Sequence, residues 1–170
     1  MPELAFLATS LTNFIKLFQR SEPLVHILYD KLNELIRRMM LKFLKSDVVK
    51  EKEGADLAAI RCNVGENWLP AKDIDIGMGT RLALSKVNND STRKELRYAF
   101  RHCSTEIVSY LQSTLPVTNH VLRDLSILQP TARKLEKGKS AICRLCQHLK
   151  KVRRTNELCD KVQVEWLMYA

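Results

Sequence analysis

The chain has little of what membrane-spanning, secreted or low-complexity proteins are built from. Its 170 residues contain no apolar run of the roughly 18 residues that a membrane span needs. Glycine and proline number only five each, which excludes a collagen-like or low-complexity chain. Aromatic residues make up 6%, which argues against a stacking platform for single-stranded nucleic acid. Five cysteines, an odd number, do not form a small disulfide scaffold and favour a reducing, intracellular compartment.

What the sequence does contain is helical periodicity, because apolar residues recur every three or four positions along most of its length. The pattern predicts seven helices, over about 4–18, 24–45, 76–87, 92–115, 119–129, 140–149 and 155–169. By residue type and spacing, we expect Thr92 with Glu95, Asn119, Ser140 and Thr155 to cap helices. The first residues, Met1-Pro2-Glu3-Leu4, lack a basic start, so we expect no cleaved secretory signal.

The remaining segments indicate loops rather than a sheet. Residues 46–75 are loop-rich, and residues 73–76 alternate in polarity like a strand too short to found a sheet. A Lys-rich loop is expected around Gly138. We therefore predict an all-α fold, an irregular bundle of about seven helices in one domain over 1–170, with at most a minor short strand near 73–76.

Positive charge is concentrated in residues 131–154. This segment has nine Lys or Arg and one acid, a net charge of +8, whereas the whole chain has a formal net charge of +9. Such a cluster attracts polyanions by counterion release, and the alternative is a solvated face that binds nothing. The candidate nucleic-acid-binding residues are Arg133, Lys134, Lys137, Lys139, Arg144, Lys150, Lys151, Arg153 and Arg154.

A second basic stripe is formed by Arg93, Arg97 and Arg101, spaced four residues apart on one predicted helix. We interpret this stripe as a solvated helix face with Glu106 and other acids as neighbours.

Two cysteines raise the possibility of a metal site. Cys143-x-x-Cys146 with His148 nearby has half of a zinc pattern, but a second ligand pair at metal-binding spacing is missing. Both cysteines stand beside Ile142 and Leu145 in a helical stripe, where thiols act as small hydrophobes. Cys143 and Cys146 are thus kept only as weak metal candidates, and we predict buried structural cysteines, no metal and no cofactor.

No catalytic motif is complete. Gly138-Lys139-Ser140 resembles the end of a phosphate loop, but the glycine that the motif requires five residues earlier is Arg133. Asp73 and Asp75 would point the same way in an extended segment, but two carboxylates without further ligands do not define a cation site. The four histidines have no recognisable spacing to a nucleophile. We predict that the chain is not an enzyme, and no small-molecule substrate is identified from its sequence.

Four phrases, in this order, resemble the hAT-like transposon-derived proteins of animals. They are Phe18-Gln19-x-x-Glu22-Pro23-Leu24-Val25-His26-x-Leu28-Tyr29; Asp73-Ile74-Asp75-Ile76-Gly77; Leu115-Pro116 with Asn119, Val121-Leu122, Leu125 and Leu128-x-Pro130; and Glu165-Trp166. The resemblance implies that the chain corresponds to the helical domain inserted into the catalytic core of such transposases. None of the family's catalytic residues can be carried onto a position here.

Two functions follow as expectations. The first is a non-catalytic, transposase-derived helical module that contacts DNA without base specificity through residues 131–154. The second is a protein–protein interaction module that uses an exposed apolar helix face, for which the best donor is the first predicted helix with Leu4, Leu7, Leu11, Phe14 and Phe18. We also expect an intracellular protein, nuclear rather than cytoplasmic, without a membrane partner.

Overall fold

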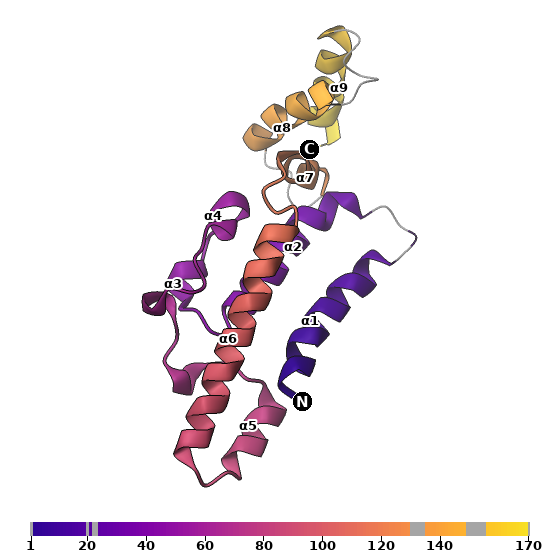
Figure 1. The fold of residues 1–170 in the computed structure, drawn as a ribbon. Helices are drawn as coiled ribbons and strands as arrows, with labels where there is room; N and C mark the ends of the chain where they lie inside the picture. The colour runs from indigo at the N-terminus through magenta and orange to yellow at the C-terminus, as the bar shows by residue number, and fades with distance from the viewer. Residues whose placement is uncertain (1, 20, 22–23, 130–134, 149–155, 170) are drawn as a thin grey trace. The chain divides into compact units, whose positions relative to one another are not determined.

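The computed structural model describes residues 2–19, 21, 24–129, 135–148 and 156–169, and within them it is all-α (Figure 1). Nine α-helices and no strands are found in these residues, which confirms the predicted fold class. Three short 3-10 helices accompany them: η1 (Gly65–Asn67), η2 (Ala71–Asp73) and η3 (Ser126–Leu128). The α-helices are α1 (Pro2–Phe18), α2 (Val25–Met40), α3 (Ser46–Val49), α4 (Gly54–Ala58), α5 (Met78–Ser85), α6 (Asp90–Thr114), α7 (His120–Leu125), α8 (Leu135–His148) and α9 (Asn156–Tyr169).

The chain divides into two compact units. The first unit comprises residues 1–20 and 32–118, and the second comprises residues 21–31 and 119–170, so the boundary falls within α2. The two helices beyond the predicted number are α3 and α4, single turns within the loop-rich segment 46–75.

The core of the first unit is built on the C-terminal part of α2 and the residues that follow it. Five apolar residues at helical spacing within the range 24–45 are almost fully buried there: Leu32, Leu35, Ile36, Met39 and Phe43. Val49, Leu57, Ile74 and Ile76 from the loop-rich segment are also buried, as is Val108 of α6. The loop-rich segment therefore contributes to the core although it forms little regular structure.

Backbone pairing in the first unit occurs at a different place from the one the polarity pattern suggested. Lys45 N donates to Asn67 O at 2.9 Å and Leu69 N donates to Phe43 O at 2.9 Å, on either side of an isolated bridge between Leu44 and Trp68. Residues 74–76 are not paired as a strand, although Asp75 N donates to Lys42 O at 2.9 Å. The alternation at 73–76 reflects the burial of Ile74 and Ile76 between more accessible aspartates.

The second unit packs α8 against α7 and α9. Its core consists of Ile127, Ala141, Ile142, Leu145, Cys146 and Trp166. The Lys-rich loop expected around Gly138 is wrong, because α8 begins at Leu135 and includes this glycine. A Cβ at Gly138 would overlap three carbons of the Trp166 ring, so the missing side chain lets α9 pack closely on α8.

Helix caps were predicted with mixed success. Asn119 caps α7 as expected, since its Oδ1 accepts from Val121 N at 2.9 Å and Leu122 N at 3.2 Å. The expected cap at Thr92 is wrong, because Asn89 accepts from Ser91 N and α6 begins at Asp90. Ser140 lies inside α8 and cannot cap it. Thr155 falls outside the described residues.

Candidate functional site

The predicted nucleic-acid-binding residues fall only partly within the described chain. Lys137 and Lys139 belong to α8, and Lys139 is exposed. Arg144, one further turn along α8, is engaged by a carboxylate. The other six lie outside the described residues: Arg133, Lys134, Lys150, Lys151, Arg153 and Arg154.

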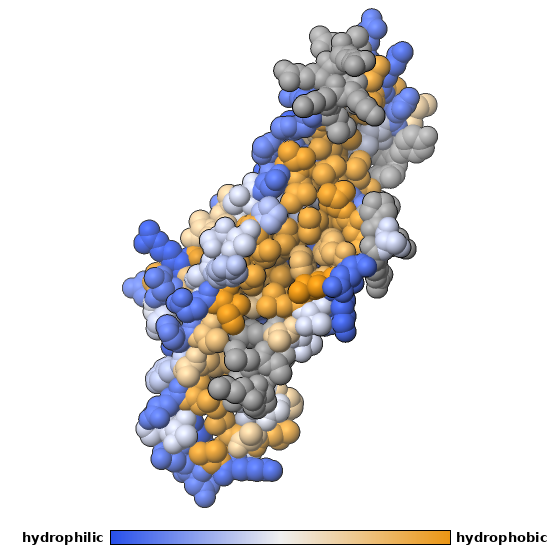
Figure 2. All heavy atoms as spheres, turned by 45° about the vertical axis from the view of Figure 1, so that its right-hand side comes forward, coloured by the Kyte–Doolittle hydropathy of each residue, from blue (hydrophilic) through white to orange (hydrophobic). Residues whose placement is uncertain are grey.

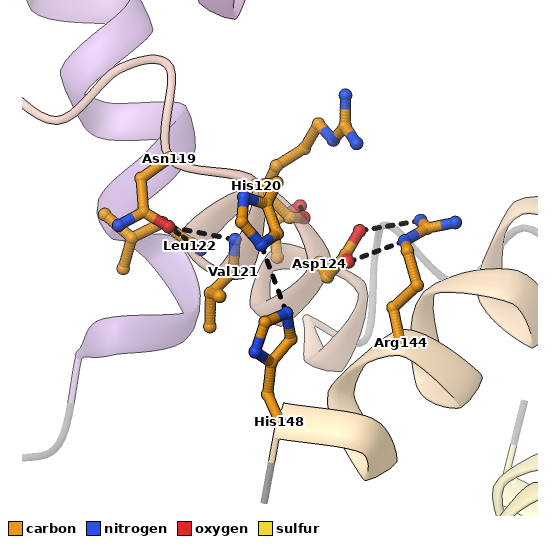
Figure 3. Close-up of polar contacts among 9 residues, drawn as sticks. Asn119, His120, Val121, Leu122, Asp124, Arg144 and His148 are labelled. Atoms are coloured by element: carbon orange, nitrogen blue, oxygen red, sulfur yellow. Dashed lines mark hydrogen bonds and ion pairs between the residues drawn. The ribbon is translucent and has the colours of Figure 1, made fainter.

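Arg144 and Asp124 form a two-pronged ion pair between α8 and α7 (Figure 3). Arg144 Nε and Nη2 donate to Asp124 Oδ2 and Oδ1 at 2.8 and 2.7 Å. The Asp124 side chain is only 2% exposed, whereas that of Arg144 is 43% exposed. The hydrogen bonds to Asp124 are the largest influence on the pKa of the Arg144 guanidinium and raise it. Arg144 therefore holds the second unit together by neutralising a buried carboxylate.

His120 at the start of α7 and His148 at the end of α8 meet beside this ion pair. Their Nε2 atoms lie 3.1 Å apart, so one ring donates and the other accepts (Figure 3). Both side chains are exposed. Two imidazole nitrogens are the beginning of a metal site, but no group of three or more His, Cys, Asp or Glu gathers anywhere in the described residues. The two histidines are 28 positions apart, so no local pattern in the sequence brings them together.

The cysteines weakly considered as metal ligands take part in helix packing. Cys146 is buried, as expected, and Cys143 is half-buried and accepts a hydrogen bond from Gln163 Nε2 of α9. Burial raises the pKa of the Cys146 thiol, and Cys159 of α9 raises it further. In the first unit, burial raises the pKa of Cys62 to about 11.

The arginine stripe on α6 is not the solvated face that the spacing suggested. Arg93 Nε donates to Val87 O at 2.6 Å, and Arg97 Nη1 donates to the carbonyls of Ala71 and Lys72 at 2.7 and 2.5 Å. Arg101 Nη2 donates to Leu69 O at 2.7 Å. These acceptors lie before and within η2 and just after α5, and the arginines of α6 donate to them.

Gln112 extends this arrangement along α6. Its Nε2 lies 3.0 to 3.1 Å from the carbonyl oxygens of Leu57, Ala58 and Ile60, at the end of α4. Like Arg97 and Arg101, Gln112 donates to backbone carbonyls of the loop-rich segment. The polar side chains of α6 therefore fix this segment against the helix. This explains how residues 46–75 are ordered with so little regular structure of their own.

A pocket of about 350 Å³ opens beside the middle of α6 in the first unit. This volume lies within the range of small-molecule sites. Arg101 lines it and stacks between two rings, with its guanidinium carbon 4.8 Å from the Trp68 ring centre and 5.5 Å from that of Tyr98. The lining residues are Asn63, Trp68, Tyr98, Arg101, His102, Thr105 and Glu106.

Sequence reasoning missed this pocket, although part of its pattern was available. Four lining residues are spaced three, four and seven positions apart on one face of α6: Tyr98, Arg101, His102 and Thr105. This part of the pattern is visible in the sequence. Asn63 and Trp68 come from the loop-rich segment, and no local pattern places them against α6.

The two aspartates considered as cation ligands have different surroundings. Asp73 is exposed, whereas Asp75 lies 3.8 Å from Lys42 Nζ and 3.6 Å from Arg81 Nη2. Asp75 Oδ1 also accepts from Gly77 N at 3.1 Å. Burial is the main influence on the pKa of Lys42 and lowers it, while Asp75 acts in the opposite direction. Lys42 and Arg81 would compete with a metal ion for the Asp75 carboxylate.

No protein family, curated protein or solved structure was found to match this chain. The transposase resemblance stays a prediction. Among the described residues, no helix is both long and apolar enough to cross a membrane.

Proposed function

We propose that this chain is a non-catalytic helical module, of transposase origin, that contacts nucleic acid without base specificity through residues 131–154. The observation that carries the proposal is the net charge of +8 in that segment. Charge of this density draws the phosphate backbone and releases its counterions, which requires no base-reading side chains.

The surroundings of the described cations in the second unit guide our choice of the residues that would contact phosphate. Arg144 is held by Asp124, so its first role is structural. Lys139 is exposed on α8 and free to approach a phosphate. The pair Lys150 and Lys151 and the pair Arg153 and Arg154 supply four charges within five residues. We assign most of the binding to these four residues.

The test is binding of a fluorescent DNA duplex, followed by anisotropy over a series of salt concentrations. A variant with Lys150, Lys151, Arg153 and Arg154 changed to Ala is expected to bind more weakly and to lose part of its salt dependence. Each phosphate contact removed lowers the slope of log affinity against log salt by about 0.9. Circular dichroism on the same samples checks that helicity is unchanged.

A matched control removes the same charge elsewhere. Lys50, Lys52, Lys86 and Lys94 are four exposed lysines of the first unit. Their joint change to Ala should leave the salt slope close to that of the unaltered chain. Equal losses in both variants would mean that net charge, rather than the segment, drives binding, and no binding by the unaltered protein would refute the proposal.

A second candidate function, protein–protein interaction, is favoured by α1. None of the side chains from Ala8 to Gln19 is fully buried, and Ile15 is 51% exposed. On α5, which contacts α1, Met78 and Leu82 are 68% and 59% exposed. Figure 2 brings the α1 side of Figure 1 forward and shows many apolar residues at the surface. An apolar interface withstands salt that disrupts phosphate contacts, so the salt series separates the two functions.

Self-association is the first form of this second function to test. Sedimentation velocity of the unaltered chain and of Ile15→Glu should show an association that the charge abolishes. If the unaltered chain is a monomer at every concentration, the partner of α1 is not a second copy of the chain.

A further inference from the structure

We propose that the pocket beside α6 binds a small planar aromatic ligand that has an acidic group, a carboxylate or a phosphate, and that Arg101 receives this group. The site lies in the first unit, is independent of the basic segment 131–154, and does not depend on the nucleic-acid proposal.

The first observation is that the positively charged Arg101 is buried without a carboxylate partner among the described residues. The residue is only 9% exposed, and no carboxylate of the described chain forms an ion pair with it. Its Nε is buried without a hydrogen-bond partner, although Nη2 is held by Leu69 O. Burial lowers the pKa of Arg101. Buried charges in proteins are ordinarily paired, so an anion beside this guanidinium would supply the missing partner.

The second observation is a hydroxyl one helical turn further on. Thr105 is 7% exposed, lines the same pocket, and its Oγ1 has no hydrogen-bond partner. Its spacing of four residues from Arg101 places both side chains on one face of α6. A carboxylate or phosphate has enough acceptor oxygens for a guanidinium and a hydroxyl together.

The third observation is the aromatic lining, which selects the body of the ligand. Trp68 and Tyr98 both line the pocket, and Tyr98 is half exposed. Flat aromatic rings contact such walls over a large area at little entropic cost. A free inorganic anion would use Arg101 without contacting either ring.

Polar side chains complete the lining. Asn63, His102 and Glu106 all border the pocket and are exposed. The Glu106 carboxylate opposes an anion, so it weakens binding without preventing it. The change Glu106→Gln should therefore strengthen binding of the acidic ligand.

The test uses paired probes that differ only in the acid: 2-naphthoate against 2-naphthamide, and adenosine 5′-monophosphate against adenosine. The readout is the indole N–H signal of Trp68 in a proton–nitrogen NMR spectrum, assigned with Trp166→Phe. The Trp166 signal is the internal control, since that residue lies in the other unit. We expect the acidic member of at least one pair to shift the Trp68 signal and to bind at least tenfold more tightly than its neutral partner.

The pattern of binding identifies the acid. A response to naphthoate alone assigns a carboxylate ligand, and a response to the nucleotide alone assigns a phosphate ligand. Equal binding of acidic and neutral partners, or no Trp68 response to any probe, would overturn the proposal.

Variants locate the binding group. Arg101→Gln should lose at least tenfold in affinity, whereas Lys94→Gln removes one positive charge from an exposed position of the same helix outside the pocket lining and should stay within twofold. Thr105→Val tests the hydroxyl with little change in volume and should weaken the acidic probes more than the neutral ones. Should Arg101→Gln not fold, Thr105→Val, Glu106→Gln and the probe pairs still decide the proposal. If Thr105→Val weakens the acidic and the neutral probes equally, the proposal is contradicted.

Discussion

Helix α6 of the first unit and helix α8 of the second both present basic residues, but they use them in different ways. On α6, Arg93, Arg97 and Arg101 each donate to backbone carbonyls of irregular segments. On α8, Arg144 neutralises a buried carboxylate and Lys139 is exposed to solvent. The arginine stripe beside the loop-rich segment thus finds backbone carbonyls as acceptors, whereas a basic helix beside other helices has fewer such acceptors. Charge alone does not distinguish the two cases.

The largest expected effect is the loss of Arg101. Arg101→Ala removes the hydrogen bond to Leu69 O and the stacking on Trp68 and Tyr98, which together should lower the free energy of unfolding by about 3 kcal/mol. Lys94→Ala, an exposed change on the same helix, should cost less than about 0.5 kcal/mol. Urea unfolding followed by Trp68 fluorescence measures both. Similar costs would mean that the hydrogen bond and ring contacts of Arg101 add little to stability.

A second contrast uses glycine within a helix of each unit. Gly138→Ala in α8 would force a methyl group into the Trp166 ring and should destabilise the second unit by about 2 kcal/mol, despite the better helix propensity of alanine. Gly79→Ala in α5 has open space around the new methyl and should stabilise the first unit by about 0.5 kcal/mol. The fluorescence of Trp166 and Trp68, one in each unit, reports the two transitions. Opposite signs are the expected result, and two stabilising changes would refute the close packing at Gly138.

The third contrast separates structural from solvent-facing cations on α8. Arg144→Gln leaves the buried Asp124 carboxylate without its partner and should cost about 1.5 kcal/mol, less than a fully buried pair because Arg144 is half exposed. Lys139→Gln should change unfolding by less than about 0.5 kcal/mol. In DNA binding, both should reduce the salt slope only slightly. A stable Arg144→Gln protein with greatly weakened DNA binding would move Arg144 from the structural group to the binding group.

The sequence predicted what depends on local periodicity and failed where distant segments meet. The apolar periodicity from Leu32 to Phe43 and the cap at Asn119 are predicted correctly, because both depend on neighbours within a few residues. Ser140 was misread as a cap because Gly138 and the lysines around it are typical of a loop. Only the Trp166 ring, 28 positions away, shows that Gly138 belongs inside a helix.

The candidate sites show the same limit. The arginine stripe on α6 was visible, but its acceptors are carbonyl groups of residues 69, 71 and 72, and backbone groups leave no pattern in side-chain identity. The pocket combines one helix face with Asn63 and Trp68 from the loop-rich segment. Their contact depends on how that segment folds over α6, which composition and spacing do not specify.

The smallest contrast compares one cap in each unit. Asn119 accepts two backbone hydrogen bonds at the start of α7, and Asn89 accepts one at the start of α6. Asn119→Ala should therefore cost about 1 kcal/mol in the second unit, and Asn89→Ala about 0.5 kcal/mol in the first, where α6 is also fixed along its length by its polar side chains. Unfolding monitored by Trp166 and Trp68 measures each cost separately. A larger cost at Asn89 would indicate that α6 depends on its first turn, and that Arg93, one turn inside the helix, positions Val87 only while that turn is intact.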